Sequence, residues 1–119
     1  MMNDYVDERM LVANACRVLA VRGLVDDILG HVSLRVDDDT VLIRARGPQE
    51  RGLRFTTADD ILAVPLEGSF ELAGGYRAPN ELSLHLELLR RNPAARSVVH
   101  AHPPAVVAFS LTGRTLLPI

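Results

Sequence analysis

Two short segments in which apolar and polar residues alternate, 31–36 and 41–46, constrain the fold of this chain more than any other feature. In the first, Val32, Leu34 and Val36 share one face, and three consecutive aspartates separate it from the second. Alternation with a period of two is typical of half-buried strands, and a polar turn between two such strands indicates a β-hairpin. We therefore expect a sheet with at least one antiparallel pair.

The other predicted elements are helices and strands spread along the chain. In order, they are a helix at 5–22, a helical turn at 55–61, a strand at 61–68, a helix at 81–91, a strand at 95–103, a helix at 104–111 and a strand that starts at 114. This order predicts an α/β fold with a mixed or antiparallel sheet. In the first helix, an apolar stripe close to the helical period is expected to face the core, and it contains Val6, Met10, Ala13, Val18 and Val21.

Composition excludes several classes of protein. A chain of 119 residues holds one domain at most, and a net charge of −2 lacks the basic surface that nucleic-acid binding needs. The single cysteine, Cys16, excludes an internal disulfide and a cysteine-based metal site. No apolar run approaches the roughly 18 residues of a membrane span, and the acidic N-terminus does not resemble a signal peptide. We expect a soluble cytoplasmic protein that does not bind membranes.

All 13 basic residues are arginines. Without a lysine, the chain cannot form a Schiff base with a carbonyl substrate or use a phosphate-binding lysine. If the chain performs carbonyl or carbanion chemistry, a metal or a cofactor must therefore stabilise the negative charge.

The strongest local signal for chemistry is the sequence His100-Ala101-His102. Side chains at positions i and i+2 of a strand lie on the same face, so two imidazoles could bind one divalent ion. Zn²⁺ suits two imidazole nitrogens best, and Co²⁺, Mn²⁺ or Fe²⁺ are possible. The alternative is a pair of strand histidines that only hydrogen-bond to the backbone.

Two ligands do not make a catalytic metal site, because such sites usually have three protein ligands and an open position. The candidates for the remaining ligands are Glu81, His85 and His31. Glu81 and His85 are four residues apart on one predicted helix, so both could face the same point. Alternatively, Glu81 is a residue favoured by the helix dipole and His85 is a buried core histidine.

A weaker signal is the segment that begins at Gly30, where a glycine before a strand allows a tight turn with free backbone N–H groups. On the next strand, Arg44 and Arg46 share a face and could bind a carboxylate or a phosphate. The alternative for both arginines is a solvated strand face.

These signals occur in an order that resembles the class II aldolase/adducin family. The matching segments are Gly30-His31-Val32-Ser33-Leu34-Arg35, Thr56-Thr57-Ala58-Asp59-Asp60-Ile61, Pro79-Asn80-Glu81 with His85, and Val98-Val99-His100-Ala101-His102-Pro103. The resemblance implies a three-layer α/β/α domain with a largely antiparallel central sheet, assembled as a homotetramer. It also implies that 1–119 is the N-terminal portion of the domain, either a piece of a longer chain or a truncated product, and that the third metal-binding histidine of the family lies downstream.

The resemblance assigns roles to individual residues. It implies that His100 and His102 bind the metal and that Glu81 is the catalytic acid/base. The residues at substrate-binding positions are Gly30, His31, Ser33, Arg46, Gly47, Pro79 and Asn80. Four of these positions depart from the sugar-phosphate aldolases, which have Asn at 31, Thr at 46 and Ser-Ser at 79–80. These departures favour a carboxylate over a phosphate and the decarboxylase-type branch of the family.

The sequence thus supports a divalent-metal-dependent carbon–carbon lyase, of the aldolase or decarboxylase type, acting on a small hydroxy-carbonyl or carboxylate substrate. The metal would stabilise an enediolate or enolate, and Glu81, with a pKa raised by burial, would move the proton. Two alternatives stay open: a non-catalytic or inactive adducin-like domain that acts through assembly, and a sugar-phosphate 4-epimerase.

Overall fold

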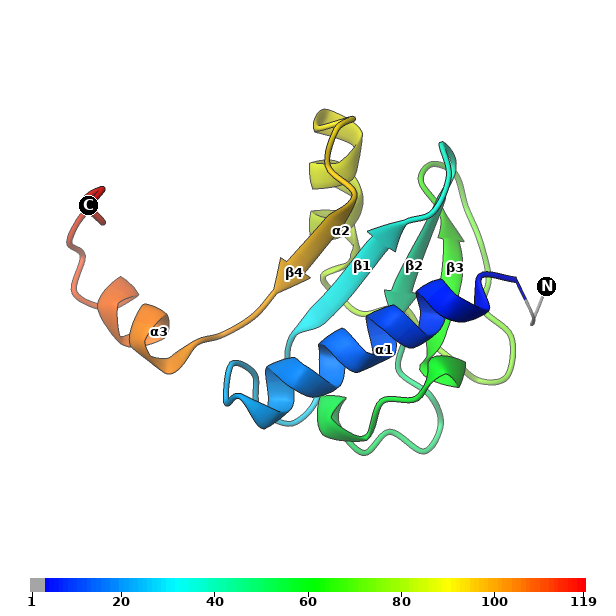
Figure 1. Ribbon diagram of the computed structural model, residues 1–119, viewed down its shortest axis with the longest axis horizontal. Coiled ribbons are helices and arrows are strands. Elements are labelled where there is room, and N and C mark those ends of the chain that lie inside the picture. The colour runs from blue at the N-terminus through cyan, green and yellow to red at the C-terminus, as the bar shows by residue number, and fades with distance from the viewer. Residues whose placement is uncertain (1–3) are drawn as a thin grey trace.

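The computed structural model describes residues 4–119 (Figure 1). Its elements are helix α1 (Val6–Val21), strands β1 (His31–Arg35) and β2 (Thr40–Arg44), the short 3-10 helices η1 (Leu53–Phe55) and η2 (Ala58–Asp60), strand β3 (Ile61–Pro65), helix α2 (Leu82–Arg91), strand β4 (Ser97–His100) and helix α3 (Pro104–Ser110). The four strands form one sheet in the order β3-β2-β1-β4, with antiparallel neighbours throughout. The predicted hairpin is confirmed, since Ser33 pairs with Ile43 and Leu34 with Leu42.

The sheet separates two helical layers. Helix α1 crosses one face, and α2 lies behind the opposite face (Figure 1). The alternation of β1 and β2 explains this arrangement, because Val32 and Leu42 pack in the core beneath α1 whereas Val41 and Ile43 pack with α2. The antiparallel three-layer α/β/α fold expected from the sequence is therefore confirmed.

Helix α1 turns a different face inward from the one predicted. Of the five predicted stripe residues, Ala13 alone is buried, and Val6, Met10, Val18 and Val21 are exposed. The buried side chains are Val12, Ala13 and Cys16. Apolar residues occur on every side of this helix, so the pattern could not select a face, and the small side chains allow the closest approach to the sheet.

Helix α2 buries Leu86 and Leu89 against the other face of the sheet. The side chain of Arg35, at the end of β1, holds the far end of this helix in place. Its guanidinium donates to the backbone carbonyls of Leu89, Asn92 and Ala95, where α2 ends and the chain turns towards β4. These bonds satisfy carbonyls that lack a partner at a helix C-terminus.

The strands end earlier than the sequence pattern predicted. Strand β3 ends at Pro65, on an edge of the sheet, as expected for a residue that cannot donate to a neighbouring strand. Strand β4 ends at His100 rather than at residue 103. The strand predicted from residue 114 is absent, because residues 114–119 have no partner strand, and Leu116 is 80% exposed.

The C-terminal segment extends away from the rest of the molecule. Helix α3 and the residues after it project to one side (Figure 1), and α3 has no buried residue. The radius of gyration is 14.9 Å, against about 13.5 Å for a compact chain of this length. Among the described residues, no helix combines the length and the hydropathy that a membrane crossing requires.

Candidate active site

All four histidines of the chain and Glu81 come together where β1, β4 and the start of α2 meet. His31 begins β1 and pairs directly with His100, the last residue of β4. Their ring centroids are 6.4 Å apart, and those of His31 and His85 are 6.3 Å apart. Residues separated by as many as 71 positions therefore form one cluster, with its members drawn from three elements.

His100 and His102 lie side by side although the strand ends between them. Their ring centroids are 4.8 Å apart, and the two Nε2 atoms are 2.7 Å apart. Two nitrogens bound to one tetrahedral Zn²⁺ lie about 3.3 Å apart, so a small opening of the pair would admit such an ion. In residues 4–119 no three His, Cys, Asp or Glu side chains form a group that could hold a metal. The two imidazoles are thus suited to be two of the ligands of a metal ion, but they do not form a complete set of ligands.

Gly30 allows the strands that carry these histidines to approach each other. Its φ of +84° lies in the left-handed region, which favours glycine. A Cβ atom at this position would lie 2.2 Å from Val25 Cγ1 and 3.0 Å from the His100 carbonyl oxygen. The neighbouring loop also anchors His102, whose backbone N–H donates to the Leu24 carbonyl at 2.8 Å. Gly30 therefore acts here as a packing residue.

His31 and Glu81 form the centre of the cluster. His31 Nδ1 lies 3.6 Å from Glu81 Oε2, and His31 is 1% exposed. Burial lowers the pKa of His31 to about 4, although the Glu81 carboxylate acts in the opposite direction. Neither ring nitrogen of His31 has a hydrogen-bond partner. A neutral imidazole with two unsatisfied nitrogens is available to a ligand.

Glu81 precedes α2 as its N-cap, rather than lying within the helix as predicted. Burial raises the pKa of this carboxyl, but a backbone hydrogen bond, the neighbouring His31 and the charge of Arg46 outweigh that effect and lower it. The prediction that burial raises the pKa of Glu81 is therefore wrong. The reason is that Glu81 is only partly buried and lies near polar and charged groups that favour its ionised form.

Ser33 and His85 form a buried pair under the cluster. Ser33 Oγ lies 2.7 Å from His85 Nδ1, and both residues are fully buried. Burial, helped by His100, lowers the pKa of His85 to about 4. The Ser33 hydroxyl is thus bonded to protein, and His85 connects α2 to β1.

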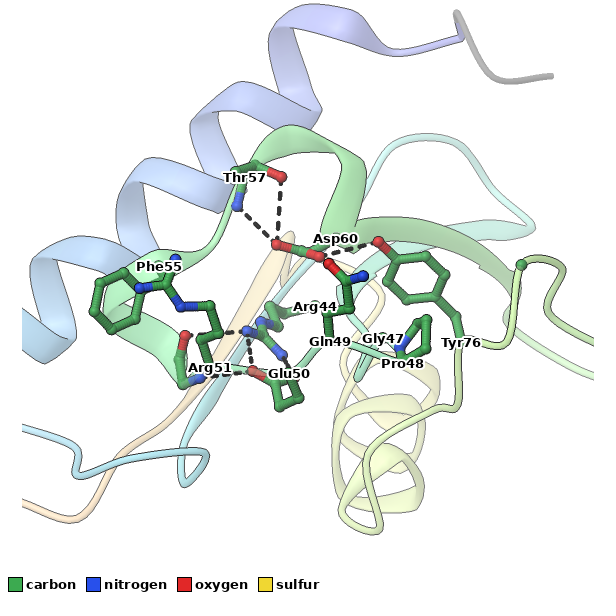
Figure 2. A pocket seen from close by; sticks show the side chains of 12 residues that line it. Arg44, Gly47, Pro48, Gln49, Glu50, Arg51, Phe55, Thr57, Asp60 and Tyr76 are labelled. Carbon is green, nitrogen blue, oxygen red and sulfur yellow. Dashed lines mark hydrogen bonds and ion pairs between the residues drawn. The ribbon is translucent and has the colours of Figure 1, made fainter.

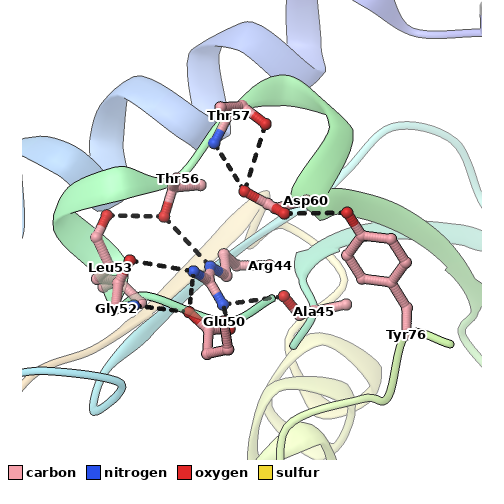
Figure 3. A network of polar contacts seen from close by, with 9 residues as sticks. All are labelled: Arg44, Ala45, Glu50, Gly52, Leu53, Thr56, Thr57, Asp60 and Tyr76. Atoms are coloured by element: carbon pink, nitrogen blue, oxygen red, sulfur yellow. Dashed lines mark hydrogen bonds and ion pairs between the residues drawn. The ribbon is translucent and has the colours of Figure 1, made fainter. Parts of the chain in front are cut away.

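Arg44 is a structural residue and is not free to bind a substrate. Its guanidinium pairs with Glu50 and also bonds to Thr56 Oγ1 and to the Ala45 and Gly52 carbonyls (Figure 3). The prediction that Arg44 and Arg46 share a face and bind an anion together is therefore wrong. Strand β2 ends at Arg44, so regular alternation stops before Arg46.

A pocket of about 280 Å³ opens beside this network (Figure 2). Gly47 and Tyr76 form part of its wall, and the Tyr76 hydroxyl donates to Asp60 Oδ1 at 3.1 Å. A Cβ at Gly47 would lie 2.8 Å from the Tyr76 ring, so the ring packs directly on this glycine. Gly47 therefore allows the Tyr76 ring to pack directly against the backbone.

The other predicted substrate-binding residues lie near the cluster. Arg46 forms an isolated antiparallel bridge with Arg77, and its charge acts on both His31 and Glu81. Asn80, next to Glu81, is exposed, and Pro79 is buried.

The family model described as the class II aldolase and adducin N-terminal domain matches residues 10–119. The chain belongs to this family. It is 59% identical over 115 residues to a 3,4-dihydroxyphthalate decarboxylase of Arthrobacter keyseri, with 93% of this chain and 46% of that protein covered. It is 56% identical over 122 residues to a protein of the same name from Terrabacter sp. (strain DBF63), with 100% and 51% covered.

A solved structure of the family supports the same conclusion. The L-fuculose-1-phosphate aldolase from Thermus thermophilus superposes with a TM-score of 0.70 and 33% identity, over 88% of this chain and 51% of that one. The chain spans about half the length of the curated relatives it matches.

Sequence reasoning about this class II aldolase family member missed Arg77. The glycine pair at 74–75 indicates a turn, but no pattern shows that the chain returns afterwards to pair with Arg46. A cation four residues before Glu81, the predicted catalytic carboxyl, is the sequence signal that could have drawn attention to Arg77.

Proposed function

We propose that this chain is the N-terminal half of a divalent-metal-dependent carbon–carbon lyase of the decarboxylase type, acting on a hydroxylated aromatic carboxylate. The observation that carries the proposal is the convergence of all four histidines and Glu81 on one point of the fold. The 59% identity to a 3,4-dihydroxyphthalate decarboxylase supports the substrate class.

His100 and His102 are the residues proposed to hold the metal. Their Nε2 atoms face each other, and imidazole nitrogen suits Zn²⁺, Co²⁺, Mn²⁺ or Fe²⁺. At least one further donor must come from outside the described residues, because the cluster offers no third ligand in a suitable position. When bound, such an ion supplies Lewis-acid stabilisation of negative charge, which a chain without lysine cannot supply through a Schiff base.

Glu81 and His31 are proposed to handle the proton. In a decarboxylation the bond to the carboxyl carbon breaks, CO₂ leaves, and the remaining carbon takes up a proton. Glu81 Oε2 is a buried carboxylate oxygen without a hydrogen bond, and it is oriented towards His31 Nδ1 at 3.6 Å. Because both pKa values are low, Glu81 is a carboxylate and His31 a neutral imidazole at neutral pH, so the pair can accept a proton and pass it on.

The metal site is tested by titrating the purified protein with Co²⁺ and measuring bound ion at equilibrium by dialysis. We expect saturable binding by the wild type through two imidazoles and a loss of at least tenfold in affinity for His100→Ala and for His102→Ala. Asp38→Asn, in the exposed aspartate turn, is the matched control and should bind as the wild type does. Equal binding by all four proteins would remove the proposed site.

The reaction is tested by following CO₂ release from 3,4-dihydroxyphthalate by the metal-loaded protein. Glu81→Gln should keep the metal and lose at least a hundredfold in rate, because a general acid–base group typically contributes that much. A protein that binds no metal and releases no CO₂ would favour the adducin-like assembly domain, and conversion of a pentulose phosphate instead would favour the epimerase. Cytoplasmic location and a homotetramer stay predictions.

A further inference from the structure

Two arginines face each other across an isolated β-bridge beside the histidine cluster. The Arg46 N–H donates to the Arg77 carbonyl at 2.8 Å, and the Arg77 N–H donates to the Arg46 carbonyl at 2.9 Å. Two residues that exchange both hydrogen bonds lie directly opposite each other, with Cα atoms about 5.5 Å apart and side chains on the same side of the ladder. The bridge therefore places the two arginines directly opposite each other, with both side chains on one side of the ladder.

No carboxylate of the described residues lies within ion-pair distance of either arginine. Neither Arg46 nor Arg77 forms an ion pair within residues 4–119, whereas Arg44, two residues before, is fully engaged by Glu50. Arg46 Nε is buried and has no hydrogen-bond partner. Like charges placed directly opposite each other destabilise a sheet, and an unsatisfied buried donor adds to the cost.

The arginine pair lies beside the cluster, because Arg77 is four residues before Glu81 and Arg46 follows the end of β2, the strand that pairs with β1. The charge of Arg46 also lowers the pKa of both His31 and Glu81. The Glu81 carboxylate does not satisfy it, because its Oε2 atom is oriented towards His31. An anion bound between the arginines would therefore be adjacent to the proposed proton-transfer pair.

We propose that Arg46 and Arg77 together bind a second anionic group of the substrate, a carboxylate that is retained in the reaction. This inference rests on the proposed function and extends it, since it makes the substrate a dicarboxylate. The planar guanidinium is suited to bidentate pairing with a carboxylate.

A phosphate monoester has the same charge chemistry and is the other possible source of the anion. Two relatives above 50% identity are named for a phthalate, which carries two carboxylates and no phosphate. We therefore assign the pair to a carboxylate, and the experiment compares the two anions directly.

The test measures the affinity of the whole protein for phthalate by calorimetry. Arg77→Gln and Arg46→Gln should each weaken phthalate binding about tenfold, the loss expected for a charged hydrogen bond. Arg17→Gln, which removes an exposed arginine from α1, is the matched control and should change the affinity less than twofold. If both arginines bind one carboxylate, the fold-loss of phthalate affinity in the double variant should be clearly smaller than the product of the fold-losses in the two single variants.

Thermal unfolding gives a second, independent measurement. Without any anion, Arg77→Gln should raise the melting temperature by about 2 °C, because it removes one of two facing charges. In the presence of phthalate, the variant should lose most of the ligand-induced rise that the wild type shows. A purely structural arginine would lower the melting temperature in both conditions.

The outcomes separate this inference from the proposed function. If Arg77→Gln weakens phthalate binding less than threefold, the arginine pair is not the anion site, whatever the metal titration shows. Tighter binding of inorganic phosphate than of phthalate, by tenfold or more, overturns the assignment to a carboxylate. Normal phthalate binding with no Co²⁺ bound by the wild type would keep the anion site and reject the metal-dependent lyase.

Discussion

At the scale of single residues, the buried histidines determine how the folded chain responds to acid. His85 is fully buried with a pKa of about 4, against an ordinary value of 6.5. Between these two values the unfolded chain binds a proton that the folded chain does not. The stabilisation is therefore complete above pH 6.5 and is lost as the pH falls towards 4.

This shift predicts a measurable pH dependence of stability. Between about pH 7.5 and pH 5, His85 should contribute a loss of about 2 kcal/mol in the free energy of unfolding. His85→Asn keeps an acceptor for the Ser33 hydroxyl but cannot titrate, so its loss over the same interval should be smaller by that amount. Urea unfolding at both pH values measures the difference, and parallel curves for the two proteins would contradict the buried neutral histidine.

At the scale of elements, the contact between β1 and β4 depends on Gly30. An alanine there would adopt an unfavourable φ and place its Cβ 2.2 Å from Val25 Cγ1. We expect Gly30→Ala to lower the free energy of unfolding by about 2–5 kcal/mol. It should also weaken Co²⁺ binding, because His100 and His102 follow the displaced strand.

Gly23→Ala is the control for this prediction. Gly23 has a similar φ of +71° but no atom near the position of a Cβ. Its substitution should therefore cost only the backbone strain, about 1–2 kcal/mol, and leave Co²⁺ binding unchanged. Equal effects of the two substitutions, in urea unfolding and in the metal titration, would show that packing at Gly30 is unimportant.

Sequence patterns were sufficient where an element has one clear periodicity. The alternation at 31–36 and 41–46 predicted the hairpin and its two faces, and the prolines before and after α2 marked the limits of that helix. The pattern failed for α1, where apolar side chains surround the helix, and for residues 114–119, where strand formation requires a partner. Pairing of Arg46 with Arg77 depends on how a long loop folds back, which local periodicity does not encode.

At the scale of the whole molecule, apolar side chains are exposed over two regions. One is the outer side of α1, where Leu11 and Val18 are 61% and 57% exposed. The other is the projecting C-terminal segment, where Leu111 and Leu117 are 84% and 74% exposed. Exposed apolar side chains and the unpaired edge of β4 are both typical of surfaces that associate with other chains.

We therefore predict that the 119-residue chain associates in solution at micromolar concentration. Replacing both Leu11 and Val18 by glutamate should shift the distribution towards the monomer, because charges on that face oppose burial. Sedimentation velocity measures the change, with Arg17→Glu on the same helix as a control for added negative charge. A wild-type chain that is monomeric at all concentrations tested would contradict the prediction.

The gathering of all four histidines also has a practical consequence. In a proton NMR spectrum of this 119-residue chain, every imidazole resonance comes from one small region. Line broadening by a paramagnetic ion, or a chemical shift caused by an aromatic ligand, can therefore be followed without isotope labelling or assignment of the rest of the spectrum. A polyhistidine purification tag would remove this advantage, so the protein should be prepared without one.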